Sequence, residues 1–387
     1  MSTSELERSP RTPSRTPSRR RFASTAALAL ALATPVALAA APARADNHVT
    51  VVAQGLDNPR HLSFGTHGDL YVAEAGRGGE GQCLTGPEGD EVCLGDSGAV
   101  TRVRHGVQRR VVTGLPSVAA PGGAQAIGPT DVAPASPRAI AVSLGLGADP
   151  AVRDAFPASA HTLGTIQVVT APGTSSQSMR TFADITAHEA ATNPIHDPDS
   201  NPGGLIKDGS GYVIADAGGN TIVAAAKGGA TSTVTVLQDQ MATAPPFLGL
   251  PEGTQIPAQA VPTSVVRGPD GALYVSQLTG FPFEAGLSTI LRIAADGTQS
   301  VYASGLTNVT DLAFDGAGTL YAVQLASDGL LNGPVGALVR VTPGSASHTV
   351  VAGGLFAPYG VALRGGAAYV TTGSIVAGGG QVVRVSL

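Results

Sequence analysis

The sequence repeats one unit six times, and this repetition restricts the chain to folds built from packed copies of a single motif. Each copy opens with a small or polar residue and an apolar strand, then has a Gly- or Asp-containing turn and a strand of aromatic and β-branched residues. One unit cannot bury its apolar faces alone, so neighbouring copies must pack together. The clearest copies are NPRHLSFGTHGDLYVAEA (58–75), VPTSVVRGPDGALYVSQL (261–278) and NVTDLAFDGAGTLYAVQL (308–325), and weaker ones begin at Gly128, Asn201 and Ala357.

A second pair of strands follows the repeat, as at residues 289–293 and 299–306, and four antiparallel strands per repeat form a β-propeller blade. The last copy has only three strands, but VTVVAQGL (49–56) precedes the first copy and matches fourth strands such as VVAGGL and VYASGL. We therefore predict an all-β, six-bladed β-propeller that is closed by an N-terminal strand completing the last blade. A seven-bladed ring is the alternative if residues 144–182 hold another blade, although they contain strand material for one hairpin.

The N-terminus has the features of an export signal. An Arg-rich start with Arg19-Arg20 is followed by the apolar run 22–41 and the small-residue cleavage site Ala43-Arg44-Ala45. We predict a signal peptide of the twin-arginine type over residues 1–45 and a single propeller domain over 46–387. The general secretory route and a retained membrane anchor are the alternatives. No later segment approaches the ~20 apolar residues of a membrane span, so the processed protein is predicted to be secreted or extracytoplasmic without an anchor.

Composition and charge narrow the class of partner. The chain has 51 Gly and 28 Pro, with 13% charged residues, which is typical of many tight turns and short strands. Residues 1–45 hold seven Arg and two Glu, so the formal net charge changes from −5 for the whole chain to −10 after processing. A negative charge disfavours nucleic acid as a partner. We expect a monomer that binds a small molecule or an extracytoplasmic protein.

The chain has two cysteines, Cys83 and Cys93, ten positions apart in a Gly-rich stretch. In an exported protein such a local pair predicts a disulfide bond that fixes a long surface loop. A zinc site would need further thiolates or a nearby His.

Alignment of the blades predicts where a site lies. First strands begin, and second strands end, on the same face of the ring, and this face also receives the long loops, where function concentrates. Four carboxylates are predicted to meet at the mouth of the channel on this face: Glu74, Asp131, Asp216 and Asp311. Oxygen ligands of this kind suit Ca²⁺ or Mg²⁺. Further residues predicted on this ligand or partner face are His61, Asn201, Asn220, Gln277, Phe281, Phe283, Asn308 and Gln324.

A structural role is the alternative for these polar residues, because Asp and Asn at strand starts commonly cap turns and join blades. Residues 197–201 with Asp208 resemble the spacing of a calcium loop, but Pro202 stands where that loop needs Gly, so a Pro-rich turn is predicted. His188, Glu189 and His196 match no zinc signature and are predicted to be solvated loop residues. No G-x-S-x-G elbow occurs, and no catalytic residue is assigned.

Six motifs together resemble the ScyD/ScyE family of exported proteins, which is named after scytonemin biosynthesis gene clusters. They are AEAGRGG (73–79), GPTDVA (128–133), GLGADPAVR (145–153), SNPGGL (200–205), ADAGGNTI (215–222) and LTGFPFEAG (278–286). The resemblance covers nearly the whole processed chain. It implies a propeller of the NHL or gluconolactonase-like kind, and the family has no settled biochemical activity.

Three functions are compatible with these features. We predict a non-catalytic scaffold that binds a ligand or protein on its long-loop face. The alternative is a divalent-metal-dependent hydrolase or lyase of the gluconolactonase-like type, with its site at the channel mouth, and this requires the four carboxylates to converge. A third possibility is a partner in an envelope pathway that acts on a secreted metabolite.

Overall fold

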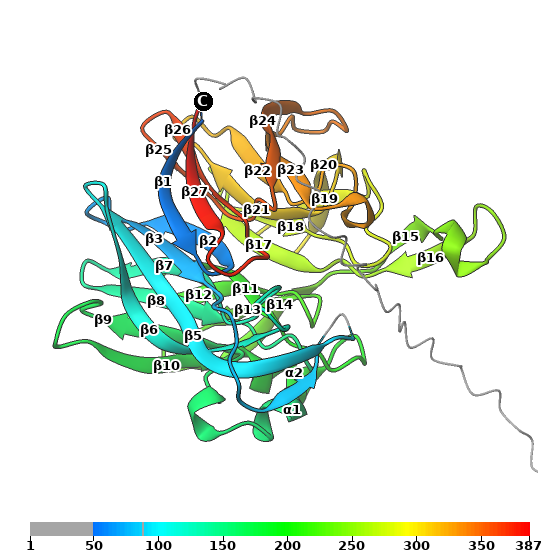
Figure 1. The fold of residues 1–387 in the computed structure, drawn as a ribbon. Coiled ribbons are helices and arrows are strands. Elements are labelled where there is room, and N and C mark those ends of the chain that lie inside the picture. The colour runs from blue at the N-terminus through cyan, green and yellow to red at the C-terminus, as the bar shows by residue number, and fades with distance from the viewer. Residues whose placement is uncertain (1–48, 87–88) are drawn as a thin grey trace, which may run out of the picture.

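The computed structural model describes residues 49–86 and 89–387, and the predicted signal peptide lies outside them. Six antiparallel sheets, five of four strands and one of five, surround a central axis and form the six predicted blades (Figure 1). In each blade the strands are given from the innermost outward.

Blade 1 consists of β2 (Pro59–Phe64), β3 (Leu70–Glu74), β5 (Glu91–Arg104) and β6 (Val107–Ala119), and blade 2 of β7 (Pro129–Ser136), β8 (Ala139–Leu144), β9 (Thr165–Thr170) and β10 (Ser178–Asp184). Blade 3 consists of β11 (Pro202–Asp208), β12 (Gly211–Asp216), β13 (Thr221–Ala225) and β14 (Thr231–Val236), and blade 4 of β17 (Pro262–Arg267), β18 (Leu273–Gln277), β19 (Ser288–Ile293) and β20 (Gln299–Leu306). Blade 5 consists of β21 (Val309–Phe314), β22 (Leu320–Gln324), β23 (Val335–Arg340) and β24 (Thr349–Phe356), and blade 6 of β25 (Val361–Arg364), β26 (Ala367–Thr372), β27 (Gly380–Ser386) and β1 (Val49–Leu56).

Strand β1 closes the ring as predicted. It pairs antiparallel with β27, with Val49 opposite Val385 and Leu56 opposite Gly380. Leu56 is fully buried in the apolar cluster between blades 6 and 1. The first and last strands of the described chain therefore share one blade, and no blade is left with an incomplete edge.

The seven-bladed alternative is wrong. Residues 144–182 form the outer hairpin of blade 2, made of β9 and β10, preceded by the short helix α1 (Pro150–Asp154) and the 3₁₀ turn η1 (Ala158–Ala160). Pro150 begins α1 and Asp149 caps it by accepting a hydrogen bond from the Ala151 N–H. The length of this segment therefore comes from a helical loop rather than from extra strands.

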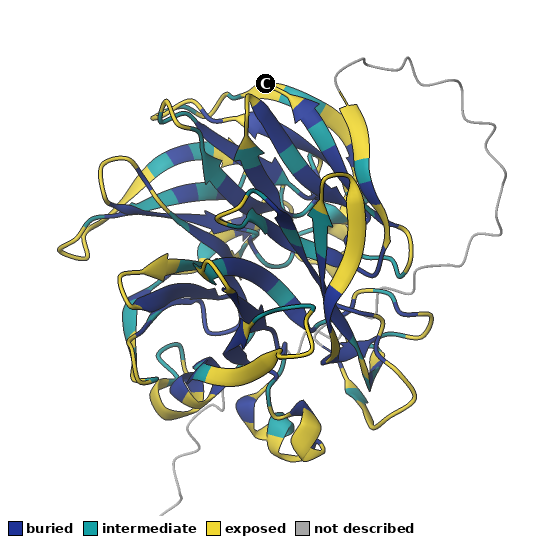
Figure 2. Cartoon of the chain, turned by 90° about the vertical axis from the view of Figure 1, so that its left-hand side faces the viewer, coloured by how far each residue is buried: buried dark blue, intermediate teal, exposed yellow. Residues whose placement is uncertain are grey.

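Apolar side chains pack between adjacent blades, where the buried residues of Figure 2 gather. A Tyr on the second strand of the blade supplies aromatic contacts at three of these junctions. Tyr274 packs edge-on against Phe314, Tyr212 against Phe182, and Tyr369 against Phe64, with ring centroids 4.8–5.0 Å apart. Such pairs add about 0.5–1.5 kcal/mol each to the area they bury.

Hydroxyl groups join the blades near the axis. In five of the six junctions a Ser or Thr Oγ donates a hydrogen bond of 2.5–2.9 Å to a backbone carbonyl of the next blade. The donor and acceptor pairs are Ser63 and Val132, Ser143 and Gly203, Thr263 and Val309, Thr310 and Tyr359, and Thr371 and Arg60.

Further elements depart from the repeat on the long-loop face. The strand β4 (Cys83–Thr85) extends blade 1, helix α2 (Ile185–Thr192) links blades 2 and 3, and a separate hairpin, β15 (Gln240–Thr243) with β16 (Gln255–Ala258), links blades 3 and 4. The hairpin carries the 3₁₀ turn η2 (Pro246–Leu248) near its tip and projects from the disc (Figure 1). A further turn, η3 (Leu330–Asn332), lies in blade 5. Among the described residues, no helix has the length and hydropathy needed to cross a bilayer.

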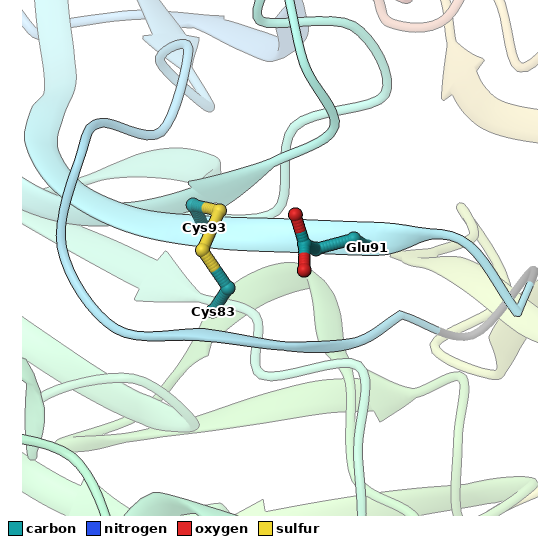
Figure 3. Close-up of side chains that lie close together, drawn as sticks. All are labelled: Cys83, Glu91 and Cys93. Carbon is teal, nitrogen blue, oxygen red and sulfur yellow. A yellow bond between two sulfur atoms is a disulfide. The ribbon is translucent and has the colours of Figure 1, made fainter.

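The predicted disulfide is present. Cys83 and Cys93 lie opposite each other on β4 and β5 and are bonded, with Cα atoms 4.0 Å apart (Figure 3). The Glu91 carboxylate lies beside them, and within the described residues these three form the one group of potential metal ligands whose donor atoms all lie within 4.8 Å of one another. Because the disulfide uses both sulfurs, this group offers no thiolate to a metal.

Candidate functional site

A cavity of about 330 Å³ lies on the axis of the propeller. Every residue that lines this cavity belongs to one of the six innermost strands. In β2, for example, the lining runs from His61 to Phe64. Three residues predicted on this face, His61, Asp131 and Asp311, therefore share one cavity wall with Ser264. All four side chains are at least nine-tenths buried.

The carboxylate of Asp311 is surrounded by hydrogen-bond donors. Its Oδ1 accepts from the Ser264 hydroxyl at 2.7 Å and from the Leu312 N–H at 2.8 Å. Its Oδ2 accepts from the Val361 N–H at 2.7 Å and lies 3.1 Å from Nδ1 of His61. These contacts connect blades 4, 5, 6 and 1, so Asp311 acts as a link between blades.

Asp131 repeats this arrangement on the other side of the ring. Its Oδ1 accepts from the Val132 N–H at 2.6 Å and its Oδ2 from the Leu205 N–H of blade 3 at 2.8 Å. In both Asp131 and Asp311, Oδ1 accepts from the N–H of the following residue and Oδ2 accepts from a backbone N–H of the next blade. In both cases the next blade has Gly at the position equivalent to the Asp.

These axial glycines, Gly204 and Gly360, allow the blades to approach. A Cβ on Gly204 would lie 2.9 Å from the Cα of Ser264, and a Cβ on Gly360 would lie 2.7 Å from the Cα of His61. Real Cβ atoms do not tolerate such distances from backbone atoms. The axial order His, Asp, Gly, Ser, Asp, Gly is therefore a packing pattern in which each Asp bonds to an amide just after a Gly.

The structure does not bring the four predicted metal ligands together. Glu74 accepts hydrogen bonds from the Asp57 N–H, the Thr101 hydroxyl and Arg110, with a 2.6 Å contact to Arg110 Nη2. Asp216 accepts from the Asn201 N–H and the Ser200 hydroxyl at the edge of blade 3. Both belong to second strands, which lie about 4.8 Å further from the axis than first strands. Metal binding by Glu74, Asp131, Asp216 and Asp311 stays a prediction, and the structure gives them no common site.

The donor set at the axis fits a metal ion poorly. Both oxygens of Asp131 and Asp311 already accept protein hydrogen bonds, so an ion would have to displace contacts that join the blades. The geometry favours the structural interpretation of these carboxylates.

Most of the other predicted face residues hold loops together. The Asn308 side chain donates to the Leu278 carbonyl, and Asn58, which was not among the predicted residues, donates in the same way to the Gly76 carbonyl. Both residues have positive φ, a conformation that Asn tolerates better than most residues. The Gln277 side chain donates to the Thr289 hydroxyl and accepts from the Gln240 side chain. The Gln324 side chain accepts from the Thr307 N–H, and the Asn220 side chain accepts from the Val261 N–H. The Asn201 backbone N–H donates to Asp216. Eight residues were predicted on the ligand or partner face, and of these only Phe281 and Phe283 lie on an apolar surface. Both are half-buried, and their rings are in edge-on contact.

The interpretation of residues 188–208 needs correction. His188 and Glu189 are not solvated loop residues, because they lie on α2 and are buried, while His196 is exposed. Asp208 ends β11 and pairs with Arg267, so it is not part of a calcium loop. The signal for this helix is local: Asp184 caps it by accepting a hydrogen bond from the Ala187 N–H, and its sequence, ITAHEAAT, is rich in Ala.

An exposed apolar surface lies at the tip of the β15–β16 hairpin. Phe247 is 63% exposed, and Met241, Leu248 and Leu250 are between 40% and 55% exposed. The hairpin is fixed to blade 4, because Glu284 accepts a 2.7 Å hydrogen bond from the Thr243 N–H and Phe247 contacts Phe281 at 6.1 Å between ring centroids. We call this surface, Met241, Phe247, Leu248 and Leu250, the apolar tip.

Burial at the axis has a consequence for stability against pH. Burial raises the pKa of Asp131 to about 6, although His61 and two backbone amides act in the opposite sense. Burial lowers the pKa of His61, but the charges of Asp311 and Asp131 outweigh it and leave that pKa raised. For each group the folded state binds its proton more tightly than the unfolded chain, so its stabilising contribution is complete at low pH and is lost as pH rises through the folded pKa.

We therefore expect the free energy of unfolding to fall more steeply between pH 3 and 7.5 in the parent than in Asp131→Asn. Over this range the parent should lose up to about 3 kcal/mol more of its free energy of unfolding than the variant. This value follows from the rise of the Asp131 pKa from 3.8 to about 6, since one pKa unit corresponds to about 1.4 kcal/mol. Urea denaturation across this pH range measures it. Parallel curves for the two proteins would show that Asp131 titrates normally.

Comparison with known proteins supports the fold alone. No family model and no curated protein sequence matches the chain. One solved structure that resembles it is a protein of unknown function from Bacteroides thetaiotaomicron, with 10% sequence identity over 88% of this chain and 75% of that chain and a TM-score of 0.50. A gluconolactonase from Xanthomonas campestris has 11% identity over 88% of this chain and 89% of that chain, with a TM-score of 0.49. Virginiamycin B lyase from Staphylococcus aureus has 9% identity over 88% of this chain and 99% of that chain, with a TM-score of 0.45. Identities this low carry no statement about activity.

The described chain is a six-bladed β-propeller, and its structural neighbours include gluconolactonase-like propellers. The resemblance to the ScyD/ScyE family stays a prediction.

Proposed function

We propose that the protein is an exported propeller that binds an extracytoplasmic protein through its long-loop face, without catalysing a reaction. The apolar tip is the observation that carries this proposal. A cluster of large apolar side chains on a projecting, anchored hairpin is typical of a protein interaction site. Phe281 and Phe283 extend the same apolar surface onto blade 4, which supports the predicted role of these two residues.

Other features support export and the ScyD/ScyE resemblance. A disulfide bond is typical of proteins that fold outside the cytoplasm. The Arg19-Arg20 signal and the six shared motifs point to the same compartment. In this proposal the processed protein is a monomer that offers one partner surface.

A metal-dependent hydrolase or lyase at the channel mouth has less support, because the axial carboxylates are committed to contacts between blades. A small molecule in the axial cavity is the second candidate, and one observation favours it: Nε2 of His61 is buried without a hydrogen-bond partner. Native mass spectrometry would reveal such a ligand as added mass on the parent and not on His61→Phe.

We expect the double variant Phe247→Ser with Leu250→Ser to lose partner binding while it keeps its stability. Both side chains are exposed, so the change in the free energy of unfolding stays within about 0.5 kcal/mol. Loss of central apolar contacts weakens a protein interface by at least tenfold. The immobilised parent is used to capture extracytoplasmic proteins, and the dissociation constant of the purified partner is then measured for parent and variant.

A matched control is Val107→Ser with Val350→Ser. These valines are 68% and 61% exposed, on β6 and β24, away from the hairpin. The control should bind like the parent. Equal affinity of the Phe247/Leu250 variant and the parent would refute the assignment of the apolar tip.

A further inference from the structure

Buried oxygens without partners gather between α2 and the turn that joins β12 to β13. Glu189 is 1% exposed, and neither of its carboxylate oxygens has a hydrogen-bond partner. The Thr221 hydroxyl is equally buried and also lacks a partner. Removing a carboxylate from water without a compensating contact is costly, so a buried carboxylate is normally paired, protonated or bound to a metal.

The glycines of the ADAGGN motif build this space. A Cβ on Gly219 would lie 2.6 Å from Oε2 of Glu189 and 3.3 Å from the Thr221 hydroxyl. The carboxylate and the hydroxyl therefore flank the same point above the Gly219 backbone. A Cβ on Gly218 would lie 2.8 Å from Oδ1 of Asp199, another oxygen without a partner. A Cβ at Gly219 would fill the space beside Glu189 and Thr221, and a Cβ at Gly218 would fill the space beside Asp199.

The charge at this place is negative and uncompensated. Two further carboxylates, Asp199 and Asp216, lie near Glu189 and add to the negative charge. Within the described residues, no Lys, Arg or His nitrogen lies within 4.0 Å of the carboxylates of Glu189, Asp199 or Asp216. His188 bonds to the Thr233 hydroxyl and does not pair with them. The neighbourhood therefore lacks a protein cation.

We propose that Glu189, Thr221 and Asp199 bind a divalent cation, Ca²⁺, with water completing its shell. The ligand set contains only oxygen, which excludes the nitrogen and sulfur coordination that zinc prefers. Glu189, Asp199 and Asp216 do not all place an oxygen within 4.8 Å of one another, so one ion does not contact all three directly. Ca²⁺ accepts irregular and partly hydrated coordination, whereas Mg²⁺ demands a near-ideal octahedron.

Asp216 has a supporting role in this site. Its oxygens accept hydrogen bonds from Ser200 and Asn201, so it supplies charge and fixes the loop that carries Asp199. The ion would tie α2 to blade 3, and thereby the connection between blades 2 and 3 to the ring. This inference does not rest on the proposed partner surface, since the apolar tip belongs to a different connection.

Isothermal titration of the EDTA-treated full chain with CaCl₂ tests the proposal. We expect one Ca²⁺ per chain for the parent and no binding for Glu189→Gln, which keeps the shape of the side chain and removes its charge. Thr221→Val removes one neutral ligand and should weaken binding about tenfold. Glu252→Gln, an exposed Glu on the hairpin loop, is the matched control and should bind like the parent.

The outcomes separate a metal site from a protonated acid. If Glu189 is simply protonated, the parent binds no Ca²⁺ and Glu189→Gln melts at the same temperature as the parent, which overturns the proposal. Ca²⁺ binding that is equal in Glu189→Gln and the parent also overturns it. If Glu189→Gln does not fold, Thr221→Val and Asp199→Asn take its place, and unchanged affinity in both contradicts the assignment.

Discussion

A chain that begins at Asp57, and so lacks β1, is expected to lose most of its stability. The deletion removes the outer strand of blade 6 and leaves β27 with an unpaired edge. It also removes Leu56 and Ala53 from the cluster between blades 6 and 1, and burial of one Leu side chain is worth about 1.5–3 kcal/mol. With eight strand residues lost, we expect a decrease of more than about 5 kcal/mol, which is comparable with the whole stability of many domains.

Calorimetric melting of this chain beside one that begins at Asp46 measures the effect. The longer chain is the control because it keeps β1 and lacks the predicted signal peptide. The peptide VTVVAQGL added in trans should partly restore the melting temperature by pairing with the open edge. Coincident melting of the two chains would contradict closure by β1.

Glu74→Gln is expected to destabilise the protein by about 2–3 kcal/mol. Glu74 is fully buried and accepts hydrogen bonds from the Asp57 N–H, the Thr101 hydroxyl and the Arg110 guanidinium. In the variant the amide nitrogen of Gln, itself a donor, would face one of these donors. Removing one partner of a buried ion pair costs about 3–5 kcal/mol, and this value is reduced here because Arg110 is partly exposed and keeps its 2.9 Å contact with Asp57.

Urea denaturation at pH 7, with and without EDTA, distinguishes this role from metal binding. If Glu74 serves the ion pair, the difference between parent and variant is the same with and without EDTA. Glu252→Gln is again the control, and should change stability by less than about 0.5 kcal/mol. A difference that disappears in EDTA would mean that Glu74 acts as a metal ligand.

The blades and the closing strand were predictable because their signals are local and repeated. The alternation of apolar residues and the turn residues recur in each copy, and VTVVAQGL matches the fourth strands closely enough to identify its place. The same alignment put His61, Asp131 and Asp311 on one face around the channel, because the repeat fixes the register of each innermost strand. It did not give their partners, which depend on how closely Gly204 and Gly360 let adjacent blades approach.

The irregular connections were not predictable in the same way. The burial of Glu189 depends on α2 folding back against Gly219, and no repeat reports that contact. Residues 240–258 lie outside the repeat and contain Pro and Gly, yet two strands of four residues pair there and expose the apolar tip. Glu74 and Asp216 were predicted at the channel mouth, and in the structure they end second strands, one strand away from the axis.

Crystals grown with TbCl₃ as a calcium substitute test most directly whether the axial carboxylates join the blades or bind a metal. If they join the blades, anomalous diffraction shows no peak in contact with Asp131 or Asp311, and the hydrogen bonds from the Leu205 and Val361 amides are intact. The terbium peak is then expected beside Glu189. A fully occupied peak bound by Asp131 or Asp311 would contradict this account and restore the metal-dependent enzyme as the leading hypothesis.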